Sequence, residues 1–108
     1  MSVRVSFDDL TLVGFDASGT EMYNYQGLPF TGIIEEYVNS VLISEIEYKN
    51  SYREGVCRAY YPNGQMSEEY FLKYNGLDGS FKTWDSNGHL NRDTTWVNGV
   101  CTYDSGDI

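Results

Sequence analysis

The sequence predicts an all-β fold, an antiparallel meander of β-hairpins built from repeats of about 23–24 residues. Three observations predict it: one motif occurs twice, each copy carries a tight-turn sequence, and the composition favours strands. Aromatic residues make up 16% of the 108-residue chain, and ten of them are tyrosines. Aromatic side chains suit a pleated, half-buried surface, where a tyrosine can pack its ring while its hydroxyl stays in water.

The repeated motif occupies Tyr52 to Gly99, and its two copies align residue by residue at a spacing of 24. A fixed period of this length is typical of an array of supersecondary units, and each unit reads as strand, tight turn and strand. The matching positions hold glycines, a large aromatic residue, a turn asparagine and an aliphatic residue: Gly55 with Gly79, Tyr60 with Trp84, Asn63 with Asn87, Gly64 with Gly88 and Met66 with Leu90.

The turn residues predict three-residue hairpin loops. Pro62 presets φ for a type I turn, Asn63 tolerates the next position, and Gly64 supplies the left-handed conformation that returns the chain. Ser86-Asn87-Gly88 is equivalent. Placing Tyr61 opposite Gln65 predicts the pairs Tyr60–Met66, Arg58–Glu68 and Val56–Tyr70, with Val56, Tyr60, Met66, Tyr70 and Leu72 on one face. The same face of the next hairpin carries Trp84, Leu90 and Trp96, and Tyr37, Tyr60 and Trp84 are expected to form a packed ladder.

The remaining segments complete one domain of residues 1–108. Residues 1–26 are expected to form an N-terminal β cap, with strands at 3–7, 10–15 and 21–25, because a repeat array needs cover at its first edge. Hairpin repeats follow at 27–50, 51–74 and 75–98, the first with Val38-Asn39-Ser40-Val41 in place of the Asn-Gly turn. Residues 99–108 read as a truncated repeat and a frayed tail. No segment predicts a helix.

These motifs resemble those of a known family. The Pro29-Phe30-Thr31-Gly32 segment, followed by Tyr60-Tyr61-Pro62-Asn63-Gly64, is similar to the MORN-variant repeat family over about residues 27–99. More narrowly, it resembles the bacterial YwqK-type antitoxins of toxin–antitoxin systems. The departures are the first copy, which lacks Asn-Gly, and Asp85, which stands where a second tyrosine is expected. The resemblance implies a hairpin meander that serves as an interaction surface.

The charge balance limits the class of partner. The net charge is −9, from 16 acidic and 7 basic residues. Nucleic acid and anionic membranes both attract positive proteins, so neither is expected as a ligand. The charge favours a basic partner, although an acidic excess that merely keeps a sheet in solution is an equal alternative. No apolar run approaches the roughly 20 residues of a membrane span, and Asp8 and Asp9 interrupt any signal-peptide region, so a cytoplasmic location is expected.

No set of residues predicts catalysis, a cofactor or a metal. His89 follows a turn without a marked partner, and two cysteines with one histidine do not make a metal site. Cys57 and Cys101 take the same place after Gly55 and Gly99, on strands about 19 Å apart at roughly 4.8 Å per strand. Both are expected to be free thiols packed as small apolar groups. The glycines belong to strands and turns and do not form a phosphate loop.

Glutamates gather in the first two repeats, at positions 35, 36, 45, 47, 54, 68 and 69. Like charges on neighbouring strands repel, so their clustering suggests a cationic partner, with tyrosines as interface anchors. The predicted function is an antitoxin or immunity protein that binds a basic toxin domain; the alternative is a general repeat scaffold for another protein. The predicted partner-binding residues are Glu35, Glu36, Tyr37, Glu45, Glu47, Tyr48, Tyr60, Tyr61, Glu68 and Glu69.

Overall fold

The computed structural model describes residues 3–74 and 76–108. The predicted start of the third repeat at Asn75, and the first two residues of the predicted cap, lie outside the described residues. The elements are β1 (Val3–Val5), the 3-10 turn η1 (Phe7–Asp9), β2 (Leu10–Phe15), β3 (Glu21–Tyr25), β4 (Leu28–Pro29), β5 (Gly32–Val38), β6 (Val41–Lys49), β7 (Tyr52–Tyr60), β8 (Met66–Lys73), β9 (Gly76–Trp84), β10 (Leu90–Val97) and β11 (Val100–Asp104).

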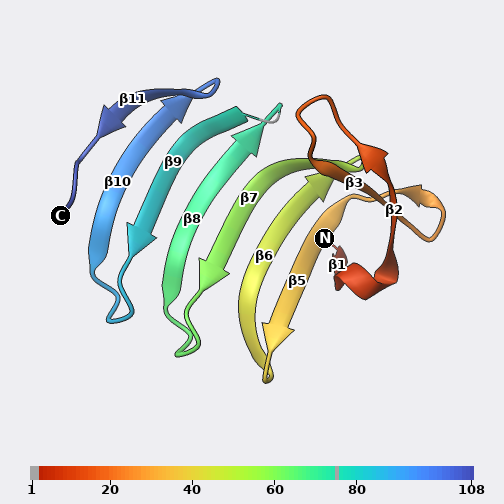
Figure 1. The fold of residues 1–108 in the computed structure, drawn as a ribbon, viewed down its shortest axis with the longest axis horizontal. Helices are drawn as coiled ribbons and strands as arrows, with labels where there is room; N and C mark the ends of the chain where they lie inside the picture. Colours follow the sequence, from red (N-terminus) through yellow and green to blue (C-terminus); the bar gives the residue numbers. More distant parts are fainter. Residues whose placement is uncertain (1–2, 75) are drawn as a thin grey trace.

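The strands form two sheets, and the larger one is a meander. Its order is β1-β5-β6-β7-β8-β9-β10-β11, and every pair from β5 onward is antiparallel, while β1 lies parallel to β5 (Figure 1). The smaller sheet has the order β2-β3-β4. The predicted all-β hairpin meander with an N-terminal β cap is therefore confirmed. The cap differs from a simple extension of the array, because only β1 joins the large sheet.

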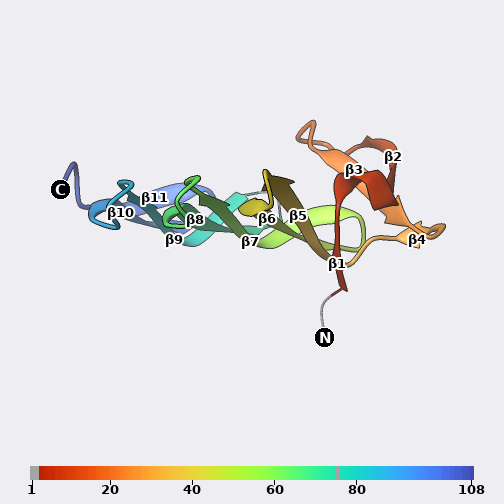
Figure 2. The same cartoon turned by 90° about the horizontal axis from the view of Figure 1, so that it is seen from below.

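The hydrophobic core lies where the small sheet packs on the first strands of the large one (Figure 2). Phe30 and Ile34 are its most buried large side chains, at 1% and 0% exposure. Tyr48 meets Tyr23 at a centroid distance of 5.7 Å and Phe30 at 6.1 Å. Phe30 sits directly after β4, so the Pro-Phe-Thr-Gly segment supplies the ring that fixes the small sheet to the array. The far end of the large sheet remains a single layer.

The hairpin loops agree with their turn chemistry. Around Pro62-Asn63-Gly64, the Tyr61 N–H donates to the Gln65 carbonyl at 2.8 Å, and the Gly64 N–H donates to the Tyr61 carbonyl at 2.9 Å. The loop at Ser86-Asn87-Gly88 has the same pattern. The first hairpin instead turns through Asn39 and Ser40, whose φ values are 51° and 65°. Two successive positive φ angles are those of a type I′ turn, which needs only two loop residues.

The predicted register of the second hairpin is wrong beyond its first pair. Tyr60 does face Met66, but Arg58 pairs with Glu69 rather than Glu68. The cause is a β-bulge, in which Ser67 is an extra residue between the partners of Tyr60 and Ala59. A one-residue shift exchanges the faces of all later side chains. Val56 therefore faces Phe71, and Tyr70 lies with Cys57 on the opposite face from Tyr60.

A second β-bulge, between β6 and β7, explains the backbone conformation of Gly55. Gly55 lies inside β7 and does not begin a strand. Its φ is +108°, and a Cβ there would lie 2.1 Å from Glu47 Oε1. The Glu47 carboxylate occupies that space and accepts a hydrogen bond from the Val56 N–H at 3.1 Å. A side chain at position 55 would displace this carboxylate.

The cysteines are both free, as predicted, but they do not occupy equivalent places. Asn98 and Gly99 form a turn with φ values of 50° and 80°, which matches Asn50 and Ser51 rather than Gly55. Cys57 is buried and Cys101 is exposed, so the prediction that both pack as apolar groups is wrong for Cys101.

The C-terminal tail is also tied down rather than frayed. The Ser105 N–H donates to the Asp93 carbonyl at 2.9 Å, and the Ile108 N–H donates to the Asn91 carbonyl at 2.7 Å. These bonds continue the pairing of β11 with β10.

Candidate partner-binding surface

The large sheet has two unlike faces. The covered face carries the small sheet, and one row of paired side chains crosses it from the core toward the other end: Val5, Ile34, Ile46, Cys57, Tyr70, Phe81 and Thr94. Because side chains alternate along a strand, their sequence neighbours point to the other side. That side, the open face, has no second layer over it among the described residues (Figure 2).

A row of charged side chains crosses the open face, one from each strand from β5 to β10. We name it the charge row: Glu35, Glu45, Arg58, Glu69, Lys82 and Asp93. Arg4 Nη1 lies 3.0 Å from Glu35 Oε1 and 2.5 Å from Glu45 Oε2. Arg58 Nε lies 2.8 Å from Glu69 Oε2. Three of the clustered glutamates therefore have cationic partners within the chain.

Glu45 is the most deeply placed member of the charge row, at 5% exposure. Burial alone would raise its pKa, but hydrogen bonds from the Tyr60 hydroxyl and from Arg4 hold the pKa below its ordinary value. Burial, together with this bond to Glu45, raises the pKa of Tyr60 to about 12. Hydrogen bonds from Tyr37 and Arg4 likewise lower the pKa of Glu35. The carboxylates are thus held in the charged form by neighbouring groups.

A second row on the open face is aromatic and aliphatic, and lies toward the hairpin loops. We name it the aromatic row: the pairs Tyr37–Leu42, Tyr60–Met66 and Trp84–Leu90. The predicted packed ladder of the three aromatic rings is wrong, since no ring contact joins them in the described chain. They stand on every second strand, about 10 Å apart. Aliphatic side chains of the return strands fill the intervals.

The structure does not gather the ten predicted partner-binding residues on one surface. Glu35, Tyr37, Glu47, Tyr60 and Glu69 lie on the open face and are at least partly exposed. Glu36 and Glu68 fall in one row with Ser44 and Ala59, on the covered face. Both are half-buried, and neither has an ion-pair partner among residues 3–74 and 76–108.

Three of the ten have structural surroundings that limit contact with a partner. Tyr48 is a core residue at 4% exposure, and its hydroxyl donates to the Glu21 carbonyl at 3.2 Å. Glu45 is buried, as described above. The Tyr61 hydroxyl donates to the Trp84 carbonyl at 2.7 Å, which joins the second hairpin to the third.

Sequence reasoning missed Arg4, the residue that holds Glu35 and Glu45. It lies 31 and 41 residues from them along the chain, on a strand that pairs in parallel with β5. No turn signal predicts this pairing, because the small sheet intervenes in the sequence. Trp84 of the aromatic row was also not selected, although its place in the repeat marks its position.

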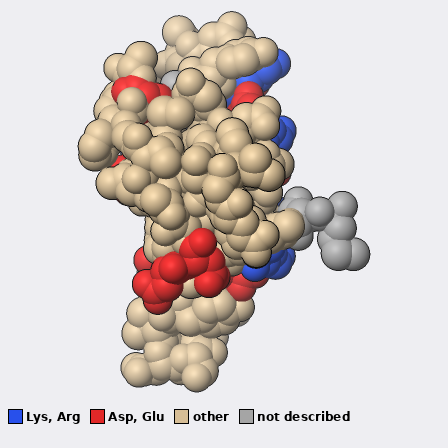
Figure 3. Space-filling view, turned by 90° about the vertical axis from the view of Figure 1, so that its right-hand side faces the viewer, with Lys and Arg blue, Asp and Glu red and all other residues tan. Residues whose placement is uncertain are grey.

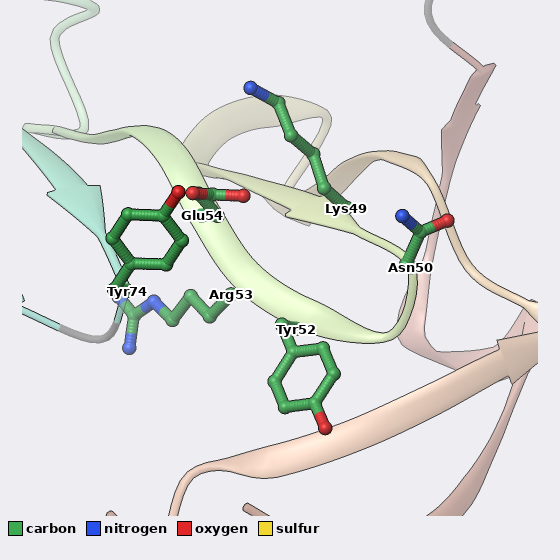
Figure 4. A pocket seen from close by; sticks show the side chains of 6 residues that line it. All are labelled: Lys49, Asn50, Tyr52, Arg53, Glu54 and Tyr74. Carbon is green, nitrogen blue, oxygen red and sulfur yellow. The ribbon is translucent and has the colours of Figure 1, made fainter.

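A pocket of about 400 Å³ lies where β7 begins, next to the turn that follows β6. It is lined by Lys49, Asn50, Tyr52, Arg53, Glu54 and Tyr74 (Figure 4). Arg53 Nη2 donates to the Tyr70 hydroxyl at 2.6 Å, and its Cζ lies 5.8 Å from the centre of that ring. These contacts fix the guanidinium against the sheet.

Charge is unevenly spread over the end of the molecule that carries the small sheet. Figure 3 shows acidic side chains gathered in one large cluster and a few smaller patches there, with most of the surface neither acidic nor basic. His89 is an exposed turn side chain, with Nδ1 3.4 Å from Asp85 Oδ2. In the described part of the chain, no three His, Cys, Asp or Glu side chains are grouped to hold a metal, and no helix could span a membrane.

Comparison with known protein families gave a match for each of the two central hairpins. Residues 53–74 and 77–98 each match the family described as the MORN repeat variant. These two segments are similar to MORN-variant repeats. The comparison with curated proteins gave no match, and neither did the comparison with solved structures.

Each MORN-variant repeat corresponds to one hairpin of the sheet. Residues 53–74 cover nearly all of β7 and β8 with their loop, and residues 77–98 cover β9 and β10. Tyr60, Tyr61, Glu68 and Glu69 lie within these repeats. The first hairpin, with Glu35 to Tyr48, continues the same sheet outside the matched residues. The protein is a β-sheet scaffold whose two central hairpins are similar to MORN-variant repeats, extended by one divergent hairpin and a β cap.

Proposed function

We propose that this scaffold is an antitoxin or immunity protein, which binds a cognate basic toxin domain through the open face of its large sheet. The observation that carries the proposal is the aromatic row on an uncovered face. Tyr37 is 57% exposed, yet its hydroxyl is held by Glu35 at 2.6 Å, so the ring is presented in a fixed position. Rigid aromatic side chains lose little entropy on binding and are common interface anchors.

The preference for a basic partner rests on the net charge of −9. A field of one sign speeds the approach of an oppositely charged protein. Repulsion among the glutamates is a weaker argument than the sequence suggested, because Glu35, Glu45 and Glu69 have partners in Arg4 and Arg58. Glu36 and Glu68 still contribute charge without an ion pair in the described chain.

The more specific part of the proposal, that the partner is a toxin, rests on the resemblance of the repeats to those of YwqK-type antitoxins. The alternative is a scaffold for another protein of the cell, which the same open face would serve. In either case we propose a cytoplasmic binding protein without catalytic activity, cofactor or nucleic-acid ligand. The gene directly upstream distinguishes the two, since an antitoxin is expected beside its toxin.

The test is a binding titration with the purified product of that upstream gene. We expect a surface interaction that Tyr37→Ala weakens at least about tenfold, as for an interface anchor. Tyr103→Ala is the matched control, because Tyr103 is 55% exposed but lies on β11 at the opposite end. Absence of binding would remove the toxin assignment. Equal weakening by both variants would show that the effect is not specific to Tyr37, and would remove the aromatic row as the binding surface.

A further inference from the structure

A hollow of about 430 Å³ lies at the loop end of the large sheet, between the first and second hairpins. It is lined by Val38, Asn39, Val41, Ile43, Tyr60 and Pro62. None of these side chains is charged, and Val38 is 52% exposed. The volume falls within the range of ligand-binding pockets, roughly 300–1,000 Å³.

The hollow exists because the loops of the repeats differ in length. The loops of the second and third hairpins touch: Asn63 Nδ2 donates to the Ser86 carbonyl at 2.7 Å, and the Tyr61 hydroxyl donates to the Trp84 carbonyl at 2.7 Å. The first hairpin closes through only two residues, Asn39 and Ser40. Its shorter loop leaves the equivalent space beside Pro62 open.

The residues at the base of this short loop are also unlike their counterparts. Val38 pairs with Val41, whereas the same positions hold Tyr61 opposite Gln65 in the second hairpin. In the third hairpin they hold Asp85 opposite His89, and Asp85 Oδ1 accepts a hydrogen bond from the His89 N–H at 3.0 Å. A valine pair, of which Val38 is exposed and Val41 half-buried, breaks the local pattern at a site where the repeat otherwise uses polar residues, and such departures concentrate at functional sites.

We propose that this hollow is an anchor pocket, which takes one bulky apolar side chain, of leucine or phenylalanine size, from an extended basic segment of the partner. The inference rests on the proposed function and deepens it. Tyr60 lines the hollow and belongs to the aromatic row, so the hollow adjoins the proposed interface at the loop end of the sheet. No basic side chain lines it, and the chain carries −9 overall, so lysine or arginine beside the inserted side chain meets no repulsion.

The first experiment probes the pocket without the partner. The full chain is titrated with the blocked tripeptides Lys-Leu-Lys and Lys-Ser-Lys, and backbone amide shifts are followed by NMR. We expect the leucine peptide to shift the amides of Val38, Val41 and Ile43, and the serine peptide to leave them in place. The double variant Val38→Thr, Val41→Thr should weaken leucine binding about tenfold, because each substitution replaces a methyl group of the lining by a hydroxyl group that an apolar side chain cannot hydrogen-bond.

The chain offers a matched control for this variant. Val97 and Val100 also pair across a two-residue turn, Asn98-Gly99, with exposures of 50% and 64%. Val97→Thr with Val100→Thr makes the same chemical change at the far end of the sheet and should leave peptide binding unchanged. Threonine keeps the β-branched shape, so both variants should retain their melting temperatures.

The outcomes separate this inference from the proposed function. Shifts at the hollow that only the Val38/Val41 variant abolishes support the pocket, even if the upstream gene product does not bind. Equal binding of the two peptides, or equal loss in both variants, overturns it. If the upstream product binds the native chain and the Val38/Val41 variant equally well, the pocket is overturned while the proposed function stands.

Discussion

At the scale of single residues, Arg4 shows how a surface side chain can support buried charge. Its guanidinium is about half exposed, with 48% of the side chain accessible, yet it reaches Glu45, of which 7% is accessible. Glu45 also accepts a hydrogen bond from the Tyr60 hydroxyl. The arginine and the tyrosine thus share the task of keeping a carboxylate charged inside the sheet, and loss of either leaves part of it without a partner.

Arg4→Met should therefore lower the free energy of unfolding by about 1–3 kcal/mol, the usual cost of an unsatisfied buried polar group. Arg92→Met is the matched control. Arg92 has 47% of its side chain exposed and pairs with Asp104, which is 40% exposed, so its loss should cost less than about 1 kcal/mol. Urea denaturation of the three proteins measures the difference. Equal losses would mean that burial of Glu45 does not determine the effect.

The ion pairs of Arg4 with Glu35 and Glu45 also predict how the stability of the fold depends on pH. Glu35 and Glu45 have pKa values below their ordinary ones, so in acid the unfolded chain binds protons that the folded chain does not. Their contribution is complete above the unfolded pKa and is lost as the pH falls from about 5. Arg4→Met removes a cause of both shifts and should flatten this dependence. Denaturation midpoints at pH 7 and pH 4 test it, and parallel curves for the two proteins would contradict it.

At the scale of elements, the hairpin loops depend on a left-handed residue. Gly64 has φ +89°, and no atom lies within 4 Å of where its Cβ would stand. Gly64→Val should therefore destabilise through backbone conformation alone, by about 1–2 kcal/mol. Gly64→Asn, which tolerates positive φ, should cost clearly less. Thermal melts compare the two. If asparagine and valine were equally harmful, a factor other than φ would govern the loop.

The strands show which features of the fold the sequence can predict and which it cannot. Alternation and turn residues located the hairpins and the Tyr60–Met66 pair, because both are local signals. The bulge at Ser67 has no such signal, and it moved the partner of Arg58 from Glu68 to Glu69. The sequence thus indicated charged residues in the right strands but assigned Glu68 to the wrong neighbour. The parallel β1–β5 pair and its Arg4 contacts depend on packing of the small sheet.

At the scale of the whole molecule, shape and charge have separate roles in the proposed binding. The small sheet covers one end of one face, so the chain presents a second, open face across the array. The charge row on that face mixes acidic with basic residues and is partly neutralised by its own ion pairs. Attraction of a basic partner must therefore come from the net charge of the molecule, while the aromatic row and the hollow hold the partner once it has arrived.

These separate roles of net charge and of the aromatic row predict whether a substitution changes the association rate or the dissociation rate. The double variants Glu36→Gln, Glu68→Gln and Asp8→Asn, Asp107→Asn each remove two negative charges from the same total of −9. If steering depends on net charge, both should slow association with the upstream gene product to a similar extent, and added salt should shrink the effect. Tyr37→Ala should instead raise the dissociation rate. Stopped-flow binding at two salt concentrations measures both rates. A much larger effect of Glu36 and Glu68 than of Asp8 and Asp107 would place the partner on the covered face, because only direct contact could distinguish pairs of equal charge.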